Sequence, residues 1–293
     1  ILRKFKNSNR KGTKSPQKIF DISQIISSYR LIKDQSEIQT MKHAAMISSN
    51  AHKRAMKFCK PGKHEFEIEA ELLHEFRKLG SSFAAYPSIV ASGPNSCILH
   101  HKAGDRILKK GDILLIDAGC EFNGYASDIT RSFPTSGKFS SPQRDIYEVV
   151  LTAQKKAIDI IKPGIDFLEP HAVAVREISQ GLVDIGLIKN KSIDEVIENE
   201  LYKNFFMHKT GHWLGMDVHD VGDYSTPLKS GMTFTIEPGC YIRPSKEVDK
   251  IFWNIGIRIE DDILVTNQGY EVLTKDVPVE ISEIESLMER FKK

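Results

Sequence analysis

The spacing of apolar residues along the chain predicts helices and strands in alternation. Helical spacing extends over residues 34–59 and 65–79, and a Pro-Gly pair or a single glycine ends each segment. A continuous apolar run, GDILLIDAGC, follows at residues 111–120 and is typical of a buried strand. The first half of the chain is therefore expected to contain two helices followed by a strand.

The same order of elements returns in the second half. Pro142 opens a predicted helix that continues to Lys162, and another predicted helix covers residues 167–185. The run GMTFTIEPGC at residues 231–240 again predicts a strand.

The two halves also match in sequence. CKPGKHEFEIEAELLHEFRKLG (59–80) resembles IKPGIDFLEPHAVAVREISQGLVDIG (161–186). KKGDILLIDAGC (109–120) resembles LKSGMTFTIEPGC (228–240) more closely, because in both a glycine precedes an acid by six residues. We infer two related halves in one domain, folded about a pseudo-two-fold axis.

This repeat pairs Asp117 with Glu237 and, approximately, His100 with His219. A pseudo-two-fold axis would bring Asp117 and Glu237 to the same place from opposite halves. The repeat is too long for a solenoid, so internal symmetry within one domain is the better interpretation.

Composition describes an ordinary globular protein. Of the 293 residues, 40% are hydrophobic and 27% are charged, and the net charge is +2. A net charge this small gives no electrostatic reason to expect binding to nucleic acid or a membrane surface. No apolar run approaches the roughly 18 residues of a membrane helix. The four cysteines form no CxxC pair, which favours reduced thiols. With no signal-peptide pattern, we expect a cytoplasmic protein.

The first twenty residues, ILRKFKNSNRKGTKSPQKIF, contain seven Lys or Arg residues and no acid. Such a segment is either a nucleic-acid-binding arm or a solvated linker. No aromatic stacking pattern accompanies the charges, which favours the linker. We therefore predict a basic linker at residues 1–33 and a single folded domain at residues 34–293, and we expect a further segment upstream in the longer protein.

Four acids on or beside predicted strands carry the candidate chemistry. Asp117 and Glu237 follow the strand-like runs ILLI and TFTI, where a bare carboxylate is costly to bury. Asp128 comes eleven residues after Asp117, across an Asn-Gly hairpin signal that would return it toward Asp117. Glu260 lies in GIRIEDD of the second half. A buried salt bridge or a strand-end cap explains one such acid, but four that converge require several positive charges.

Two divalent ions would balance these four carboxylates, and a hydroxide bridging the ions would carry the one remaining negative charge. An oxygen-rich site with one imidazole suits Mn²⁺. The stretch HWLGMDVHDVG supplies two histidines, His212 and His219, seven residues apart. One of them can be a metal ligand while the other contacts a substrate.

These stretches resemble the metal-site signatures of a known family. DAGCEFNGYASDITRSFP, HKTGHWLGMDVHDVG, TIEPGCYI and GIRIEDD are similar to those of the pita-bread-fold metallopeptidases, and among them to the aminopeptidase P (Xaa-Pro aminopeptidase) family. The resemblance covers roughly residues 30–290. It implies an α+β pita-bread fold of the creatinase/aminopeptidase type, in which helices cover a curved antiparallel sheet with two pseudo-symmetric halves.

The resemblance also implies roles for individual residues. Five are expected to bind metal, and two of these, Asp128 and Glu260, to bridge two ions: Asp117, Asp128, His212, Glu237 and Glu260. Four are expected to take part in catalysis or contact the substrate: Glu237, as proton acceptor and donor, and His219, His208 and His100. Three are expected at the substrate-binding side: Thr130, which would help to receive the amino terminus, and Tyr86 and Arg258, which would also orient the carboxylates.

The implied function is a metal-dependent aminopeptidase that releases the N-terminal residue from peptides with proline in the second position, by means of a hydroxide activated by two metal ions. Mn²⁺ is the preferred ion, with Co²⁺ and Zn²⁺ as alternatives. The expected partners are peptides with an Xaa-Pro amino terminus. The family's extra amino-terminal domain, which supports oligomerisation, has no counterpart in this chain, so a homo-oligomer is expected only where that domain is present.

Other functions remain open at this stage. Prolidase, which cleaves Xaa-Pro dipeptides, shares the ligands, although HWLG and DITRSFP favour aminopeptidase P. Methionine aminopeptidase has different histidine and turn motifs. Non-catalytic pita-bread binding modules and creatinase-like hydrolases lack the complete five-residue set that is present here. For Cys120 and Cys240, core packing is favoured over metal ligation.

Overall fold

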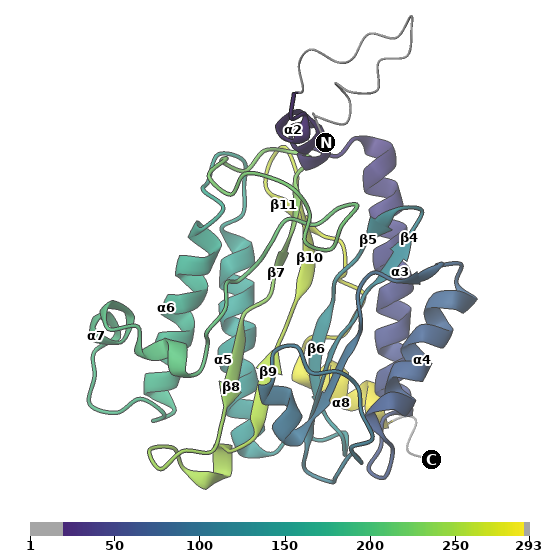
Figure 1. Ribbon diagram of the computed structural model, residues 1–293. Helices are drawn as coiled ribbons and strands as arrows, with labels where there is room; N and C mark the ends of the chain where they lie inside the picture. Colours follow the sequence, from purple (N-terminus) through teal and green to yellow (C-terminus); the bar gives the residue numbers. More distant parts are fainter. Residues whose placement is uncertain (1–19, 290–293) are drawn as a thin grey trace, which may run out of the picture.

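Two pairs of long helices flank a set of antiparallel strands in the computed structural model, which describes residues 20–289 (Figure 1). The helices are α2 (Ser23–Leu31), α3 (Gln35–Phe58), α4 (Glu65–Lys78), α5 (Ser141–Asp159), α6 (Glu169–Asp184), α7 (Ile193–Glu198) and α8 (Ile281–Glu289). Short 3-10 helices are η1 (Gly93–Cys97), η2 (Leu201–Asn204) and η3 (Lys250–Phe252).

The strands of the first half are β1 (Phe83–Ala84), β2 (Ile89–Ser92), β3 (Ile113–Asp117), β4 (Cys120–Phe122), β5 (Tyr125–Ala126) and β6 (Thr130–Pro134). Those of the second half are β7 (Thr233–Ile236), β8 (Gly239–Ile242), β9 (Ile255–Arg258), β10 (Asp261–Val265) and β11 (Tyr270–Val272). The predicted helices therefore correspond to α3 to α6, and the two predicted strands to β3 and β7.

The helices form where the chain supplies caps and an apolar face. Asp34 caps α3 by accepting hydrogen bonds from the backbone N–H groups of Ser36 and Glu37, and the Glu37 carboxylate accepts from the Asp34 N–H in return. Ser140 begins α5 in a similar way with Gln143. The buried faces of α3 and α4 pack on each other and on the strands of the first half, whereas in the second half α5 packs on both α6 and the strands. The two helix pairs therefore lie on opposite sides of the strands (Figure 1).

Each half contains two antiparallel chain segments. Each segment consists of two strands separated by a short break, and the breaks in the two segments lie next to each other. In the first half β3 pairs with β6 and β4 with β5, and in the second half β7 pairs with β10 and β8 with β9. The interruptions carry the four candidate acids. Asp117 ends β3 and Asp128 precedes β6, whereas Glu237 follows β7 and Glu260 precedes β10. The inferred pairing of Asp117 with Glu237 thus corresponds to equivalent places in the two halves.

The Asn-Gly hairpin signal is confirmed. Asn123 and Gly124 join β4 to β5 with φ angles of 49° and 83°, the conformation that a tight two-residue hairpin turn requires. The turn sends the chain back so that Thr130 pairs with Asp117 across β3 and β6. The two halves meet directly beyond this point, where the backbone N–H of Glu260 donates to the carbonyl of Thr130 over 3.0 Å.

Two glycines allow the backbone to approach closely beside the acids. A Cβ atom at Gly119 would lie 1.6 Å from the carbonyl oxygen of Ser127, and one at Gly211 would lie 2.0 Å from that of Thr235. Both neighbours are backbone atoms, which cannot move aside without separating the paired segments. Glycine is therefore required at both positions because the neighbouring segments lie too close for a Cβ atom. Neither glycine has a positive φ.

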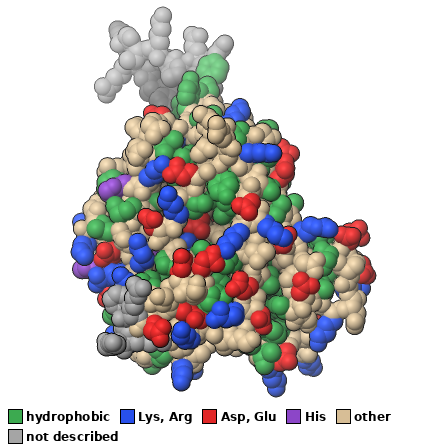
Figure 2. Space-filling view, turned by 180° about the vertical axis from the view of Figure 1, so that it is seen from behind, with side chains coloured by type: hydrophobic (Ala, Val, Ile, Leu, Met, Phe, Trp, Pro, Cys, Tyr) green, Lys and Arg blue, Asp and Glu red, His purple; other side chains and the backbone are tan. Residues whose placement is uncertain are grey.

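The other expectations about the chain can be compared with the described residues. Helix α2 lies within the predicted linker, residues 1–19 are outside the described part, and the domain boundary at residue 34 stays a proposal. Among residues 20–289, no helix combines the length and apolar character needed to cross a bilayer. All four cysteines are buried and unpaired. On the face in Figure 2, acidic and basic side chains are interspersed.

We predict that Gly119→Ala and Gly211→Ala each destabilise the protein by about 3 kcal/mol, because the new methyl group overlaps a backbone carbonyl. Urea unfolding at a fixed metal concentration measures the loss. Gly269→Ala is the matched control, since its Cβ would meet only the carbonyl of Ile161 at 3.8 Å. A control as damaging as the two test variants would contradict the steric explanation.

Candidate metal centre

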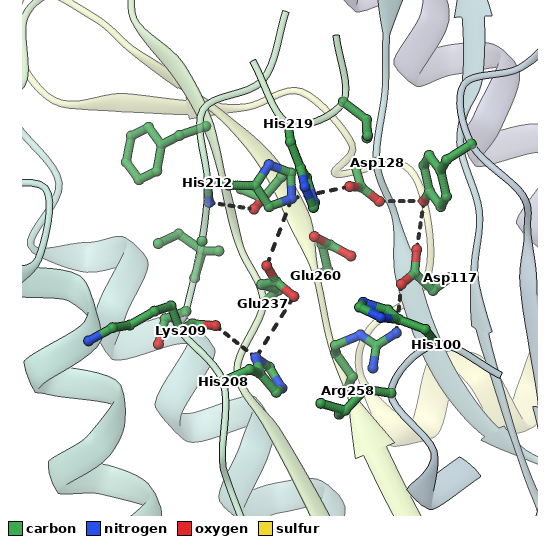
Figure 3. Close-up of a pocket in the computed structure, with 18 of the residues that line it drawn as sticks. His100, Asp117, Asp128, His208, Lys209, His212, His219, Glu237, Arg258 and Glu260 are labelled. Atoms are coloured by element: carbon green, nitrogen blue, oxygen red, sulfur yellow. Dashed lines mark hydrogen bonds and ion pairs between the residues drawn. The ribbon is translucent and has the colours of Figure 1, made fainter. Parts of the chain in front are cut away.

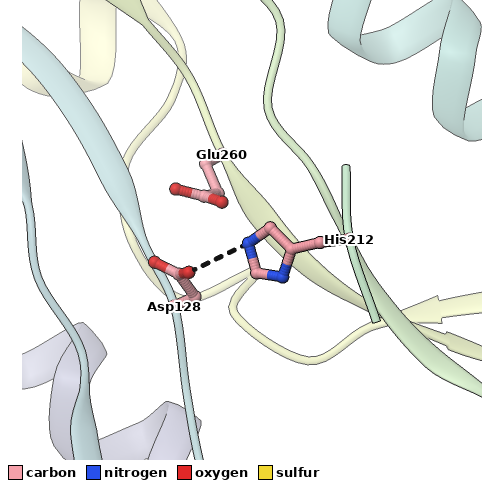
Figure 4. Close-up of side chains that lie close together, drawn as sticks. All are labelled: Asp128, His212 and Glu260. Atoms are coloured by element: carbon pink, nitrogen blue, oxygen red, sulfur yellow. Dashed lines mark ion pairs between the residues drawn. The ribbon is translucent and has the colours of Figure 1, made fainter. Parts of the chain in front are cut away.

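The five predicted metal-binding residues converge on one place (Figure 3). They come from both halves and from the interrupted strands or the loop before Trp213. One ligand atom each from Asp128, His212 and Glu260 lies within 4.8 Å of the others (Figure 4). Nε2 of His212 is 3.4 Å from Oδ2 of Asp128 and 3.8 Å from Oε1 of Glu237.

His212 is oriented by its neighbours in the chain. Its Nδ1 lies 3.0 Å from the carbonyl oxygen of Trp213, which leaves Nε2 directed at the acids. The backbone around His212 is tied to β7, because the N–H of Thr235 donates to the His212 carbonyl over 3.0 Å. Trp213 is fully buried and its ring packs on Phe167 and Phe234, which anchors the loop in the core.

Three further predicted residues contact the acids. Nη2 of Arg258 donates to Asp117 over 2.6 Å. The Tyr86 hydroxyl lies 2.6 Å from Oδ1 of Asp117 and also within hydrogen-bond distance of Asp128. A hydroxyl group has only one hydrogen, so Tyr86 can give a full hydrogen bond to only one of these two carboxylates at a time.

Thr130 lies behind the site. Its buried hydroxyl donates to Oε2 of Glu260 over 2.6 Å and accepts from Nε of Arg258 over 3.2 Å. Thr130 is not among the residues that line the cavity, so in this structure it holds Glu260 in place. Its expected contact with the amino terminus of a peptide stays a prediction.

The charges of the cluster are far from balanced by the protein. Four carboxylates face one guanidinium, that of Arg258, and the imidazole of His212, while Nδ1 of His208 lies farther off, 4.0 Å from Oε2 of Glu237. Burial, and then the charges of Asp128 and the other acids, raises the pKa of Glu260 well above its ordinary value. Burial also raises the pKa of Glu237 to about 7. Without metal, the cluster therefore lowers its repulsion by retaining protons.

Asp128 and His212 form the ion pair of this cluster. Burial opposes the charged form of Asp128, but the hydrogen bond and charge of His212 outweigh it and lower the pKa of Asp128 below its ordinary value. Burial likewise opposes the charge on His212, but Asp128 outweighs it and raises the pKa of His212 to about 9. In the metal-free protein the imidazolium of His212 thus serves as one of the missing cations.

The remaining predicted histidines surround the acids. The ring of His219 lies 4.2 Å from that of His212, and burial, followed by the His212 charge, lowers its pKa. Burial and the nearby Arg258 charge lower the pKa of His208 to about 3, so its imidazole is neutral. His100 is exposed and faces the same cavity (Figure 3).

Both nitrogens of His208 already have protein partners. Nδ1 donates to the carbonyl of Lys209 over 2.7 Å, so Nε2 accepts from the hydroxyl of Tyr241 over 2.8 Å. Tyr241 also accepts from Nη1 of Arg258 over 2.9 Å. A hydrogen bond from His208 to a substrate would replace one of these contacts, and that role stays a prediction.

Tyr241 is a site residue that the sequence reasoning missed. It is the third residue of β8 and links His208 to Arg258 from a fully buried position. Its position in TIEPGCYI, four residues after Glu237 on a paired strand, could have indicated that it belongs to the site. Asp262 was also missed, although GIRIEDD contains it; its carboxylate accepts from the backbone N–H of Asp128 over 3.1 Å.

A cavity of about 780 Å³ opens beside the acids. One wall is apolar and comes from the start of α6, the loop after His212 and β7: Phe167, Leu168, Pro170, Val218, Tyr224, Phe234 and Ile236. The opposite wall combines apolar residues with a run of cationic and imidazole side chains: Pro87, Ile89, Leu99, His100, His101 and Lys102. A space of this size accommodates a short peptide.

The donor set fits divalent metal ions. Carboxylate oxygens with one imidazole nitrogen are ligands for hard or borderline cations such as Mn²⁺. The raised pKa values of Glu237 and Glu260 indicate positions where protons now occupy the place of cations. Asp117, Asp128, His212, Glu237 and Glu260 are thus the residues that could hold metal.

Comparison with known proteins assigns the class. Residues 39–267 match the model of metallopeptidase family M24. The chain therefore belongs to metallopeptidase family M24, and its α+β architecture is the pita-bread fold that the resemblance implied.

Individual relatives narrow the likeness. The chain is 48% identical to the Xaa-Pro aminopeptidase of Haemophilus influenzae over 92% of its own length and 64% of that protein. It is 43% identical to the Xaa-Pro aminopeptidase of Escherichia coli over 100% of its own length and 67% of that protein. The solved structure of Pseudomonas aeruginosa aminopeptidase PepP superposes with a TM-score of 0.95 at 48% identity, covering 99% of this chain and 67% of that one. The chain thus spans about two thirds of the length of these relatives.

We predict that metal binding releases protons and strengthens as the pH rises. Glu237, with a pKa of about 7, and His212, with a pKa of about 9, must lose protons before they can bind a cation. The apparent Mn²⁺ affinity should therefore increase between pH 5.5 and 8.5. Calorimetric titration in buffers of different ionisation enthalpy measures the protons released.

Glu237→Gln provides the control for this titration. It removes the carboxyl group that titrates near pH 7, so Mn²⁺ binding at pH 6 should release about one proton fewer than in the unmodified protein. An Mn²⁺ affinity that does not vary with pH would rule out the protonated cluster.

Proposed function

We propose that the chain hydrolyses peptides from their amino terminus and releases the first residue where the second is proline. The observation that carries this proposal is the convergence of four carboxylates and an imidazole beside a cavity of peptide size. The Xaa-Pro aminopeptidases of Haemophilus influenzae and Escherichia coli, to which the chain is similar, support the choice of substrate.

We assign the metal-binding role to Asp117, Asp128, His212, Glu237 and Glu260, with Asp128 and Glu260 shared between two ions. Mn²⁺ is the proposed ion, and Co²⁺ and Zn²⁺ are the alternatives. When bound, a pair of divalent ions supplies an activated water molecule as nucleophile and polarises the scissile carbonyl group. Arg258, Tyr86 and Thr130 hold the carboxylates in position.

Glu237 is the proposed proton carrier. It borders the cavity, where a carboxylate beside the activated water molecule can accept its proton and later return it. His208 and His219 are neutral because burial lowers their pKa values, so they suit hydrogen bonding to the substrate and to the developing oxyanion. His100 is assigned to the proline side of the substrate.

We attribute the proposed preference for proline to its missing N–H donor and to packing of its ring. The peptide bond before proline has no N–H group. A pocket that offers no hydrogen-bond acceptor at that position therefore loses no hydrogen bond when proline binds there. A side chain and a proline ring can pack on the apolar wall described above, which includes Phe167 and Ile236. They can also pack on the side chains of Pro87, Ile89 and Leu99.

The broader properties of the protein are proposals of the same kind. We assign residues 34–293 to the catalytic domain and expect action on peptides in the cytoplasm. We expect a homo-oligomer where the region that the longer relatives possess is present.

We predict that Asp128→Ala lowers kcat/KM on an Xaa-Pro-Xaa tripeptide by at least about 100-fold and lowers the bound Mn²⁺ content. The change removes a shared ligand and the partner of His212. Elemental analysis and a tripeptide assay measure the two effects. Asp276→Ala, an exposed aspartate away from the cavity, should change neither. Full rate and full metal content in Asp128→Ala would refute the assignment.

We also predict that Xaa-Pro-Xaa tripeptides are cleaved with a kcat/KM about tenfold or more above both the Xaa-Pro dipeptide and the Xaa-Ala-Xaa tripeptide. Amino-acid release with Mn²⁺ present gives the three rates. Faster cleavage of the dipeptide would assign the chain to prolidase activity. No cleavage of any peptide by fully loaded protein would favour a binding function.

A further inference from the structure

Glu65 is a buried carboxylate outside the candidate metal centre. It lies in the first turn of α4, and its side chain is completely inaccessible. Oε1 accepts hydrogen bonds from the N–H and the hydroxyl of Ser92, both over 2.7 Å, and from Nδ2 of Asn95 over 3.0 Å. Oε2 accepts from Nε2 of His101 over 2.8 Å and from the N–H of Gly104 over 3.3 Å.

This arrangement determines which nitrogen of His101 carries hydrogen. Burial raises the pKa of Glu65, but the hydrogen bonds from Asn95, His101 and Ser92 outweigh it and lower the pKa below its ordinary value, so Glu65 is an anion. An anion only accepts, and therefore Nε2 of His101 must be the protonated nitrogen. Nδ2 of Asn95 also lies 3.2 Å from this Nε2, and both groups donate to the same carboxylate.

The other nitrogen of His101 is available. Within residues 20–289, no hydrogen bond to Nδ1 of His101 is found. The side chain is 18% exposed and lines the cavity, between His100 and Lys102. In the neutral ring, Nδ1 is thus the acceptor nitrogen of a side chain that lines the cavity.

The neighbouring His100 depends on the same anchor. Its ring makes no hydrogen bond to any residue in the described part of the chain, so its position follows from the backbone that carries it. Glu65 holds that backbone through His101 and Gly104, and the N–H of Phe66 donates to the carbonyl of Gly104 over 3.2 Å.

We propose that His101, oriented by Glu65, is a further substrate-binding residue whose Nδ1 accepts a hydrogen bond from the N–H of the residue after the proline. This inference rests on the proposed function. An aminopeptidase has one residue before the cleaved bond, so most of the peptide runs along the cavity wall away from the metal. Proline has no N–H, and the first donor beyond the cleaved bond therefore belongs to the third residue. Glu65 acts through His101 and is a positioning residue.

The test uses Mn²⁺-loaded protein and two dipeptides, Pro-Leu and its analogue with an N-methylated leucine. The leucine N–H of Pro-Leu corresponds to that of the third residue in a tripeptide. Calorimetry should show that the unmodified protein binds Pro-Leu about tenfold more tightly than the methylated analogue. His101→Phe should bind both dipeptides with similar, weaker affinity.

Two variants keep the test independent of folding defects. If His101→Phe does not fold, Glu65→Gln preserves the side-chain volume, and its affinity ratio should fall below about threefold. His74→Phe replaces an exposed histidine on α4 and should keep the full ratio. Thermal midpoint and metal content should match those of the unmodified protein in each variant used.

The tautomer gives a readout without activity. Nitrogen-15 NMR should show His101 protonated at Nε2 and bare at Nδ1, with the two tautomers mixed in Glu65→Gln. Equal affinity ratios in the unmodified protein and His101→Phe, or hydrogen on Nδ1 at neutral pH, would overturn the inference. If the protein binds Pro-Leu as expected but cleaves no peptide, the proposed function fails while the inference about His101 stands.

Discussion

Four carboxylates, two buried and two partly buried, around a single guanidinium are the constraint on which this structure depends. Removing such charges from water is costly, and the protein meets part of that cost with Arg258, the Tyr86 and Thr130 hydroxyls, and a protonated His212. What these groups leave uncompensated appears as raised pKa values at Glu237 and Glu260. Divalent cations would remove the remaining repulsion, which is why membership of a metallopeptidase family and the electrostatics of the cluster support the same interpretation.

The fold brings these acids together because both halves have the same arrangement of strands. In each half, two paired antiparallel segments are interrupted at the same level, and an acid lies at each interruption. Gly119 and Gly211 permit the backbone contacts that keep the segments close. The junction between Thr130 and Glu260 then joins the two halves. Strand pairing and close backbone approach thus together determine the positions of the four candidate acids.

The cavity walls divide the remaining tasks. Burial keeps His208 and His219 neutral, so they can exchange hydrogen bonds without carrying charge. On the opposite wall, the Glu65 anion is satisfied by five donors and fixes the ring of His101. The candidate metal centre and the cavity wall therefore differ in how their carboxylates are compensated. The four acids of the candidate metal centre have too few cations near them, whereas the single Glu65 carboxylate is surrounded by hydrogen-bond donors.

Much of this protein is determined by local sequence. Apolar periodicity and Pro or Gly stops located α3 to α6, because these signals act within a few turns of the chain, and the repeat located the equivalent acids Asp117 and Glu237. The Asn-Gly signal placed the β4–β5 turn, because that turn requires two positive φ angles. The roles of Tyr241, Thr130 and Glu65 were decided only by tertiary structure. Each depends on partners far away in the chain, such as Arg258 for Tyr241 and His101 for Glu65. Periodicity reports which face of an element is buried, whereas the partner of a buried polar group is determined by how the elements pack.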